Sequence, residues 1–346
     1  MINEWKLVVA VQVEGRDTMQ FINNFRGIAI LLIMLIHAIG TINNDGSPVL
    51  YALELLLDNT TILFVVVAGY LFSSLSTNFN YVDYLKHKFK IVIIPYFFVS
   101  IPAIVIYMSG LKNTHFWLDI NWLHSLGPVY QYLYFMLSGA HLVTLWFIPM
   151  IIPLYIFSPS FLYIKNKQLL GIFFILSLIP ALWFGRPDFS VNNVIWTVYF
   201  LPTYLLGMLL WQRPNIYEML TKYSGIILVG YIIIYLSLSW DGAFNTSVDL
   251  LWKMALSVIL IAFTKRYLSK KNKCLNMFAR LSFYLYFVHG YFISTIRIVY
   301  NQYLSVEVTG LFAASVSFAM TLFLSLSSFV IIKMILKQRS KLFIGL

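Results

Sequence analysis

Long apolar runs separated by short polar stretches recur along almost the whole chain. A helix needs about 20 mainly apolar residues to cross a lipid bilayer. The segments that approach or exceed this length are residues 26–43, 55–75, 91–109, 143–163, 168–184, 193–211, 224–240, 247–264, 278–299 and 309–336. The pattern therefore predicts an all-α integral membrane protein, built as a bundle of about ten transmembrane helices.

The composition excludes a soluble protein. Of the 346 residues, 60% are hydrophobic and only 11% are charged, whereas soluble domains average about 45–50% and about 25%. So few charged side chains cannot cover a water-facing surface, and most of the outer surface therefore has to face lipid. This excludes a soluble enzyme, a nucleic-acid-binding domain and a disordered protein. Although the net charge is +11, we expect membrane lipids and no nucleic acid among the partners.

The Lys and Arg residues lie almost entirely on one side of this layout. With a cytoplasmic N-terminus, the outer side receives only four of the 24, namely Lys112, Arg186, Lys253 and Arg297. The positive-inside rule then places both termini in the cytoplasm, which requires an even number of spans. We expect residues 1–20 to be a dispensable N-terminal extension and residues 21–346 to form one transmembrane domain.

Two ionisable residues share one face of the first span. Arg26 and His37 lie about 20° apart around the helix and about 16 Å apart along its axis. Such side chains are costly inside a membrane helix, so both are functional candidates. His289 lies at a similar depth in the ninth span. A neutral imidazole acts as a base near pH 7; the alternative for each histidine is a core residue bonded to a neighbour.

Other candidates lie nearer to the membrane surfaces. His141 is either part of a site or an ordinary residue of the outer interface. A basic segment at the cytoplasmic end of the third span either holds phosphate groups or only orients the helix; its lysines are Lys86, Lys88 and Lys90. The single cysteine, Cys274, excludes a cysteine-built cluster. Because the histidine-bearing spans supply no carboxylates and no His-Glu-x-x-His spacing, we expect no metal.

The order of motifs along the chain matches a known pattern. Arg26 and His37, in a helix that starts Asn24-Phe-Arg-Gly-Ile-Ala-Ile, are its most specific element. The later motifs are Phe64-Val-Val-Val-Ala-Gly69-Tyr70, Lys86-His-Lys-Phe-Lys with Pro95-Tyr96, His141 with Leu145-Trp146-Phe147, Pro202-Thr-Tyr-Leu-Leu-Gly207, and Ser282-Phe-Tyr-Leu-Tyr286-Phe-Val-His289. Over nearly the whole chain after Phe21, the sequence resembles membrane-bound acyltransferase family 3, which contains bacterial polysaccharide O-acetyltransferases.

The resemblance implies a reaction, a location and a set of site residues. An acyl group, most often acetyl, moves from cytoplasmic acetyl-CoA or another acyl-CoA to a hydroxyl of an envelope or exported polysaccharide, or of a lipid-linked glycan. The protein is then a multi-pass protein of the bacterial inner membrane, with His37 as general base. The implied site consists of the catalytic residues His37, Arg26 and His289, the donor-binding residues Arg26, Lys86, Lys88 and Lys90, and the acceptor-binding residues His141, Trp146 and Tyr286.

Alternatives to this interpretation belong to other classes of membrane protein. A transporter or flippase of lipid-linked saccharides also needs about ten spans, a basic cavity and intramembrane histidines, but it does not need the spacing of Arg26 and His37. A membrane glycan polymerase would carry a long outer loop with arginines, which the sequence lacks. The basic segment departs from the family pattern, because lysines stand where the family has two arginines, and lysine cannot bind a phosphate through a bidentate fork.

Overall fold

The computed structural model describes residues 19–43, 46–115, 117–187, 192–240, 242, 244–303 and 308–337. Across these residues the chain is helical, and its one extended pairing is an isolated parallel bridge between Asn43 and Thr309. The predicted all-α class is therefore confirmed for this part of the chain. Nearly all of the expected N-terminal extension, residues 1–18, and the end of the basic C-terminal tail, residues 338–346, lie outside the described residues.

The helices are joined to one another through short connections. In chain order they are α2 (Gln20–Ile39), α3 (Pro48–Leu57), α4 (Thr61–Leu75), α5 (Tyr81–Lys88), η1 (Phe89–Ile93), α6 (Ile94–Met108), α7 (Ile120–Ser125), α8 (Pro128–Ser138), η2 (Val143–Trp146), α9 (Phe147–Ile156), α10 (Ser158–Asn166), α11 (Leu170–Phe184), α12 (Asn193–Gln212), α13 (Asn215–Thr221), α14 (Ser224–Ser239), α15 (Thr246–Tyr267), α16 (Lys273–Tyr303) and α17 (Gly310–Leu336).

Several helical stretches are long and apolar enough to cross a membrane. Among the described residues they number six, which are Gln20–Ile39, Pro48–Leu75, Tyr81–Met108, Asn193–Gln212, Thr246–Tyr267 and Gly310–Leu336. The number rises to eight if each of two bent pairs is one span: α8 with residues 143–156, bent by 71°, and α13 with α14, bent by 95°. The chain is a multi-pass helical membrane protein, as the apolar pattern predicted.

Two of the predicted spans are divided. Within residues 55–75, Asn59 separates α3 from α4 with a left-handed φ of 57°, a conformation that an α-helix excludes. Within residues 143–163, α9 ends at Ile156 and α10 begins at Ser158 with Pro159 in its first turn. Proline is well suited to a first turn because it has no N–H to donate. The apolar pattern continues through both breaks and therefore did not reveal them.

Glycines let the central helices touch backbone to backbone. A Cβ built on Gly69 of α4 would overlap the Tyr204 carbonyl of α12, and a Cβ on Gly207 would overlap the Val66 carbonyl of α4. Small residues at such crossings allow the close packing that holds membrane helices together. Gly69 and Gly207, which belong to two of the sequence motifs, thus form one helix crossing. They pack α4 against α12 and are part of the scaffold.

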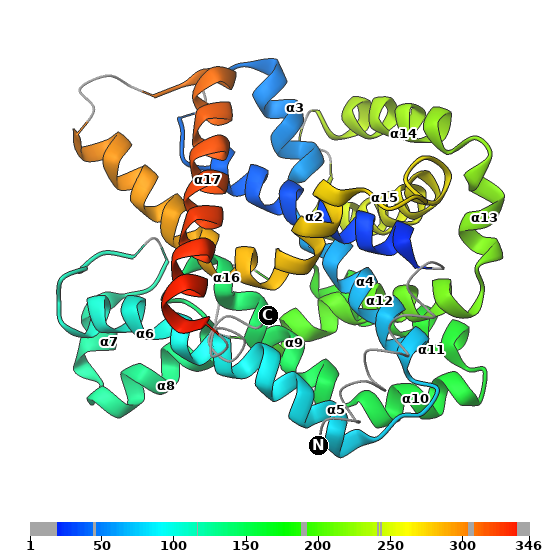
Figure 1. The fold of residues 1–346 in the computed structure, drawn as a ribbon, viewed down its shortest axis with the longest axis horizontal. Helices are drawn as coiled ribbons and strands as arrows, with labels where there is room; N and C mark the ends of the chain where they lie inside the picture. The colour runs from blue at the N-terminus through cyan, green and yellow to red at the C-terminus, as the bar shows by residue number, and fades with distance from the viewer. Residues whose placement is uncertain are drawn as a thin grey trace.

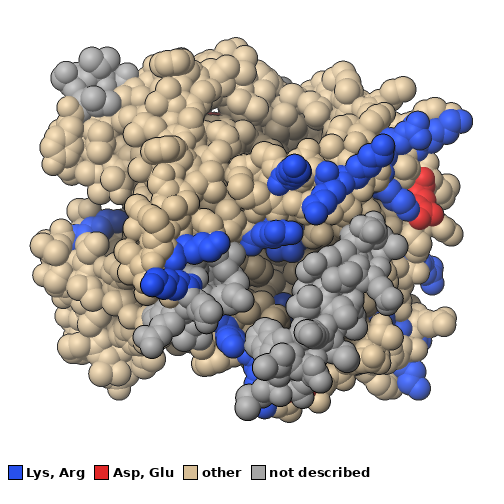
Figure 2. All heavy atoms as spheres, in the orientation of Figure 1, with Lys and Arg blue, Asp and Glu red and all other residues tan. Residues whose placement is uncertain are grey.

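The arrangement places α2, α4, α12 and α16 in the middle of the bundle, with α6, α7 and α8 at one edge and α13 and α14 at the other (Figure 1). Much of the periphery is apolar; Trp183 and Phe312 are each 84% exposed. Charged side chains gather in a band across one face, and most of the remaining visible surface is uncharged (Figure 2). Such a surface fits lipid better than water.

Candidate functional site

The predicted histidines meet where α2 packs against α16. The rings of His37 on α2 and His289 on α16 have their centroids 5.3 Å apart. Farther toward the start of both helices, Arg26 Nη2 donates a hydrogen bond of 3.0 Å to Ser282 Oγ. Ser282 and His289 are two turns apart and share a face of α16, as Arg26 and His37 share a face of α2. The structure therefore brings Arg26, His37 and His289 to one interface. They make two separate contacts along it, Arg26 with Ser282 and His37 with His289.

His289 has one committed and one free ring nitrogen. Its side chain is completely buried, and Nδ1 lies 2.8 Å from the Leu285 carbonyl. Because a carbonyl only accepts, Nδ1 carries the proton and Nε2 of the neutral ring is an acceptor. That Nε2 has no partner among the described residues. A buried polar atom without a partner is costly, and here it lies in the ring beside the half-buried His37.

Tyr286 attaches the 3₁₀ turn η2 to this interface. Its hydroxyl donates to the Thr144 carbonyl of η2, and its ring lies 5.9 Å from the His289 ring. A Cβ on Gly290 would meet Thr144 Oγ1 at 2.5 Å, so only glycine fits there without a shift of Thr144. The predicted acceptor-binding tyrosine is thus brought to the histidine pair, and its hydroxyl holds η2 against α16.

His141 makes its ring contacts in the described part of the chain with residues other than the histidine pair. It is buried, and its Nδ1–H donates 3.1 Å to the Phe135 carbonyl, which leaves Nε2 without a partner in the described part of the chain. Its ring neighbours are Tyr96, at 6.0 Å, and Phe135, at 5.8 Å. His141 is therefore a buried imidazole with a free acceptor, but it belongs to the packing of α6 and α8 rather than to the ring pair of α2 and α16.

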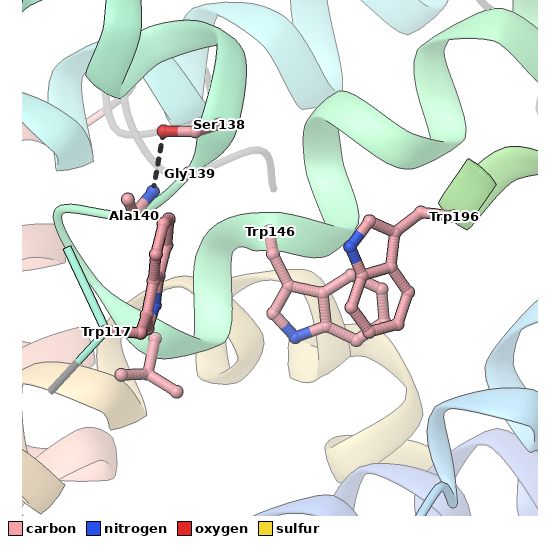
Figure 3. A pocket seen from close by; sticks show the side chains of 7 residues that line it. Trp117, Ser138, Gly139, Ala140, Trp146 and Trp196 are labelled. Atoms are coloured by element: carbon pink, nitrogen blue, oxygen red, sulfur yellow. Dashed lines mark hydrogen bonds between the residues drawn. The ribbon is translucent and has the colours of Figure 1, made fainter. Parts of the chain in front are cut away.

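Trp146 forms one wall of a narrow pocket. Its ring lies 4.3 Å from that of Trp196 and 5.7 Å from that of Phe200. Trp117 faces it across the pocket, while Trp196 lies beside Trp146 on the other side (Figure 3). The remaining lining residues are Ser138, Gly139, Ala140 and Val143. The predicted acceptor-binding tryptophan is therefore part of a cluster of three indoles that the motif alone did not reveal.

The three lysines of the basic segment are not equivalent. Lys88 Nζ lies over the Tyr155 ring of α9, 4.9 Å from its centroid, and close enough to Arg26 for their charges to repel. Lys86 and Lys90 are exposed. The π-helical turn η1, which contains Lys90, separates the other two from α6, and such turns are frequent at functional sites. Of the segment, Lys88 is the lysine that faces the Arg26 end of the interface.

The family assignment rests on a match to almost the whole chain. The family model described as an acyltransferase domain matches residues 19–340. The chain belongs to acyltransferase family 3. It is thus a membrane acyltransferase, and the resemblance carried by Arg26, His37 and the later motifs is confirmed. Comparison with curated proteins gave no match, and comparison with solved structures gave none either.

This acyltransferase also contains a polar network at the junction of α3 and α4 that the sequence did not indicate. Lys253 of α15 is buried and donates to the carbonyls of Leu55 and Leu56 at 2.7 and 2.8 Å. Asp249, one turn earlier, lies 3.9 Å from Lys253 Nζ. A cation at the carboxyl end of α3 satisfies carbonyls that the helix leaves unpaired.

Neighbouring helices complete the network. Asn59 Nδ2 donates to Tyr199 Oη at 2.8 Å and to Asp249 Oδ2 at 3.1 Å, while Tyr235 Oη donates to Asp249 Oδ1 at 2.9 Å. Nearby, Arg186 Nη1 bonds to both carboxylate oxygens of Asp58 at 3.0 Å. The spacing of Asp249 and Lys253 within a predicted span was the available signal. Their partners lie far away in sequence, which is why the network was missed.

In the described part of the chain, no group of three His, Cys, Asp and Glu residues is placed to hold a metal ion. The α2–α16 interface contains a ring nitrogen, His289 Nε2, that can accept a hydrogen bond. The His37 imidazole lies beside it, and the Arg26 guanidinium lies two to three helical turns away. This set can remove a proton from a hydroxyl and hold an anionic group at the other end of the interface.

Proposed function

We propose that this acyltransferase moves an acetyl group from cytoplasmic acetyl-CoA to a hydroxyl of an envelope or exported polysaccharide. The observation that carries the proposal is the pairing of the His37 and His289 rings, whose centroids are 5.3 Å apart. The pair lies on the same interface as the hydrogen bond from Arg26 to Ser282. This interface joins a candidate base to a candidate anion-binding group within a family 3 chain.

In the proposed reaction, a sugar hydroxyl attacks the thioester carbonyl of the donor. His37 takes the hydroxyl proton as the new C–O bond forms, and His289 Nε2 holds the acceptor through a second hydroxyl group. The tetrahedral intermediate then collapses, the C–S bond breaks, and the coenzyme thiolate takes the proton from the His37 imidazolium. The products are an acetyl ester and free coenzyme A, so atoms and charges balance.

The donor would reach His37 from the Arg26 side. Arg26 and Lys88 are half-buried cations at that end of the interface, and both suit the phosphates of coenzyme A. Lys86 and Lys90 would contribute a more distant attraction, because their side chains are exposed. The thioester arm would then run along α2 toward the histidine pair. Tyr286, Trp146 and His141 would contribute to the acceptor side.

We also propose that the chain crosses a bacterial inner membrane ten times with both termini in the cytoplasm. The support is the uneven distribution of Lys and Arg, together with α11, the two bent helix pairs and the 31-residue α16, which bring the six long stretches to ten. Cysteine labelling should find position 45 outside and position 270 inside. If both positions lie on one side of the membrane, the layout is wrong.

The activity itself is tested by the mass of the cell's glycan. Cells that contain this chain should carry polysaccharide whose repeating unit is heavier by one acetyl group than that of cells without it. A transporter would change the amount of polysaccharide at the surface and leave the mass of each unit unchanged. Equal unit masses in the two strains would overturn the proposed acetylation.

A further inference from the structure

A recess opens at the surface where the start of α11 meets the end of α12. Its volume is about 280 Å³, close to the lower end of the range for ligand pockets, which is about 300 Å³. None of the residues that line it belongs to α2 or α16, so the recess is separate from the histidine pair. They are Gln168, Leu170, Gly171, Leu209, Gln212 and Arg213.

The polar groups of the recess suit a phosphate. Arg213, which follows the last residue of α12, makes no ion pair with a carboxylate of the described residues. Gln212 Nε2 donates to the Lys165 carbonyl at 3.1 Å, which leaves the second N–H of this amide for another acceptor. A guanidinium and an adjacent amide donor together match the several acceptor oxygens of a phosphate group.

The side of α11 that continues from the recess is apolar and exposed. Ile175 and Ile179 lie one and two turns after Gly171 on the same side of the helix, and they are 62% and 63% exposed. In a membrane protein such a surface contacts the acyl chains of lipids. A cationic recess at one end of an apolar stripe therefore matches an amphiphile with an anionic head better than it matches a water-soluble anion.

We propose that this recess binds the headgroup of an anionic phospholipid, with the acyl chains of the lipid along α11. The Arg213 guanidinium binds the phosphate through two N–H groups, and the Gln212 amide bonds to a further oxygen of the headgroup. In the proposed orientation the lipid belongs to the cytoplasmic leaflet. It joins the start of α11 to the end of α12, and its binding depends on neither the acyl group nor the acceptor of the proposed reaction.

The first test compares two lipids on the purified full-length protein in neutral detergent. Native mass spectrometry should find phosphatidylglycerol retained at concentrations at which phosphatidylcholine is not. Arg213→Gln should weaken retention of phosphatidylglycerol about tenfold, because the phosphate loses its charged donor. Lys222→Gln is the matched control, since Lys222 is an exposed cation after α13 that does not line the recess, and it should change nothing.

A second variant fills the recess and keeps every cation. A Cβ on Gly171 would meet open space, so Gly171→Phe should abolish retention of phosphatidylglycerol without lowering the unfolding temperature of the lipid-free protein. Gly230→Phe is its control, because Gly230 of α14 also faces open space but lies outside the recess, and it should retain the lipid.

Three results would overturn the proposal. The first is equal retention of phosphatidylglycerol and phosphatidylcholine by the unmodified protein. The second is unchanged retention of phosphatidylglycerol by both Arg213→Gln and Gly171→Phe. The third is displacement of phosphatidylglycerol by an equal concentration of inorganic phosphate or coenzyme A, which would assign the recess to a soluble anion instead of a lipid. Because no acyl transfer is measured, a failure here is distinguishable from a failure of the proposed acetylation.

Discussion

Two regions of the bundle place ionisable side chains among apolar helices, and they differ in how these groups are paired. At the junction of α3 and α4, Lys253 has two carbonyl acceptors and a carboxylate within 3.9 Å. At the α2–α16 interface, Arg26 makes no ion pair with a described carboxylate, and His289 Nε2 has no partner within the described residues.

The difference separates scaffold from site. Buried charges stabilise a fold only when their partners compensate the lost hydration, and the Lys253 network meets that condition. Buried polar atoms that are left unpaired destabilise the free protein and call for a specific explanation. A hydroxyl donor from the acceptor would supply the partner that His289 lacks. The pairing of the ionisable groups, more than their presence, therefore distinguishes the two regions; in the Lys253 network the atom without a partner among the described residues is an amide oxygen, Asn59 Oδ1.

The largest effect on stability is expected from Lys253→Met. The substitution keeps the apolar stem but leaves the carbonyls of Leu55 and Leu56 and the Asp249 carboxylate without their cation. Breaking a buried pair on one side costs about 3–5 kcal/mol. The free energy of unfolding, measured in detergent, should fall by that amount, and activity per folded molecule should stay close to normal. A loss under about 1 kcal/mol would show that the network does not support the fold.

The opposite pattern is expected at the histidine pair. His289→Phe keeps an aromatic ring in the core but removes the unpartnered nitrogen, so the free energy of unfolding should be unchanged or higher. Acetyl transfer should fall by about 10²-fold, because the acceptor loses its contact. Rates and unfolding curves on the same preparation would measure both. A variant that is less stable but fully active would reverse the roles assigned to the two regions.

Among the lysines, Lys88 should matter most for the donor. Lys88→Met should raise KM for acetyl-CoA about tenfold with a smaller change in kcat, because the phosphates lie far from the reacting carbonyl. Lys86→Met is the matched control, since Lys86 is exposed, and its smaller effect should shrink further as salt screens it. If the Lys88→Met and Lys86→Met variants have equal KM values for acetyl-CoA, Lys88 does not have the special role in donor binding that is proposed for it.

The smallest effect is expected for a surface pair on the same helix as Lys253. Lys265 Nζ lies 2.5 Å from Glu218 Oε1, and the two side chains are 34% and 43% exposed. Exposed pairs contribute about 0–1 kcal/mol, so Lys265→Ala should barely change the unfolding curve. If Lys265→Ala costs as much as Lys253→Met, burial does not explain the difference between the two lysines.

Helical periodicity predicted the part of the site that lies within one segment of the chain. Arg26 and His37 were expected on one face of their helix, and they lie on the face that meets α16. Their partners Ser282 and His289 depend on the register between two helices far apart in the chain, which periodicity cannot supply. His289 was already a candidate because it lies inside a predicted span, and the family resemblance also implies it as a site residue.

The features that the sequence missed depend on local backbone geometry or on distant partners. The left-handed Asn59 divides an apolar run that reads as one span, and it joins a network with Tyr199 and Asp249. Lys86 and Lys88 both lie on α5 and point to different sides because residues two apart on a helix do not share a face, whereas the π-helical turn at residues 89–93 follows them and has no signal in the apolar pattern. Trp117 and Trp196 come from connections and helices remote from Trp146, so the pocket exists only in the folded chain.

The most direct test of the account is the rate of acetyl transfer by His37→Ala protein, measured beside its unfolding temperature. His37 is assigned the general base, and loss of general-base help typically costs about 10²–10⁴-fold in rate. The account predicts a fall of that size in kcat, with KM for acetyl-CoA and the unfolding temperature unchanged. Transfer at the normal rate, or a loss fully explained by unfolded protein, would contradict it.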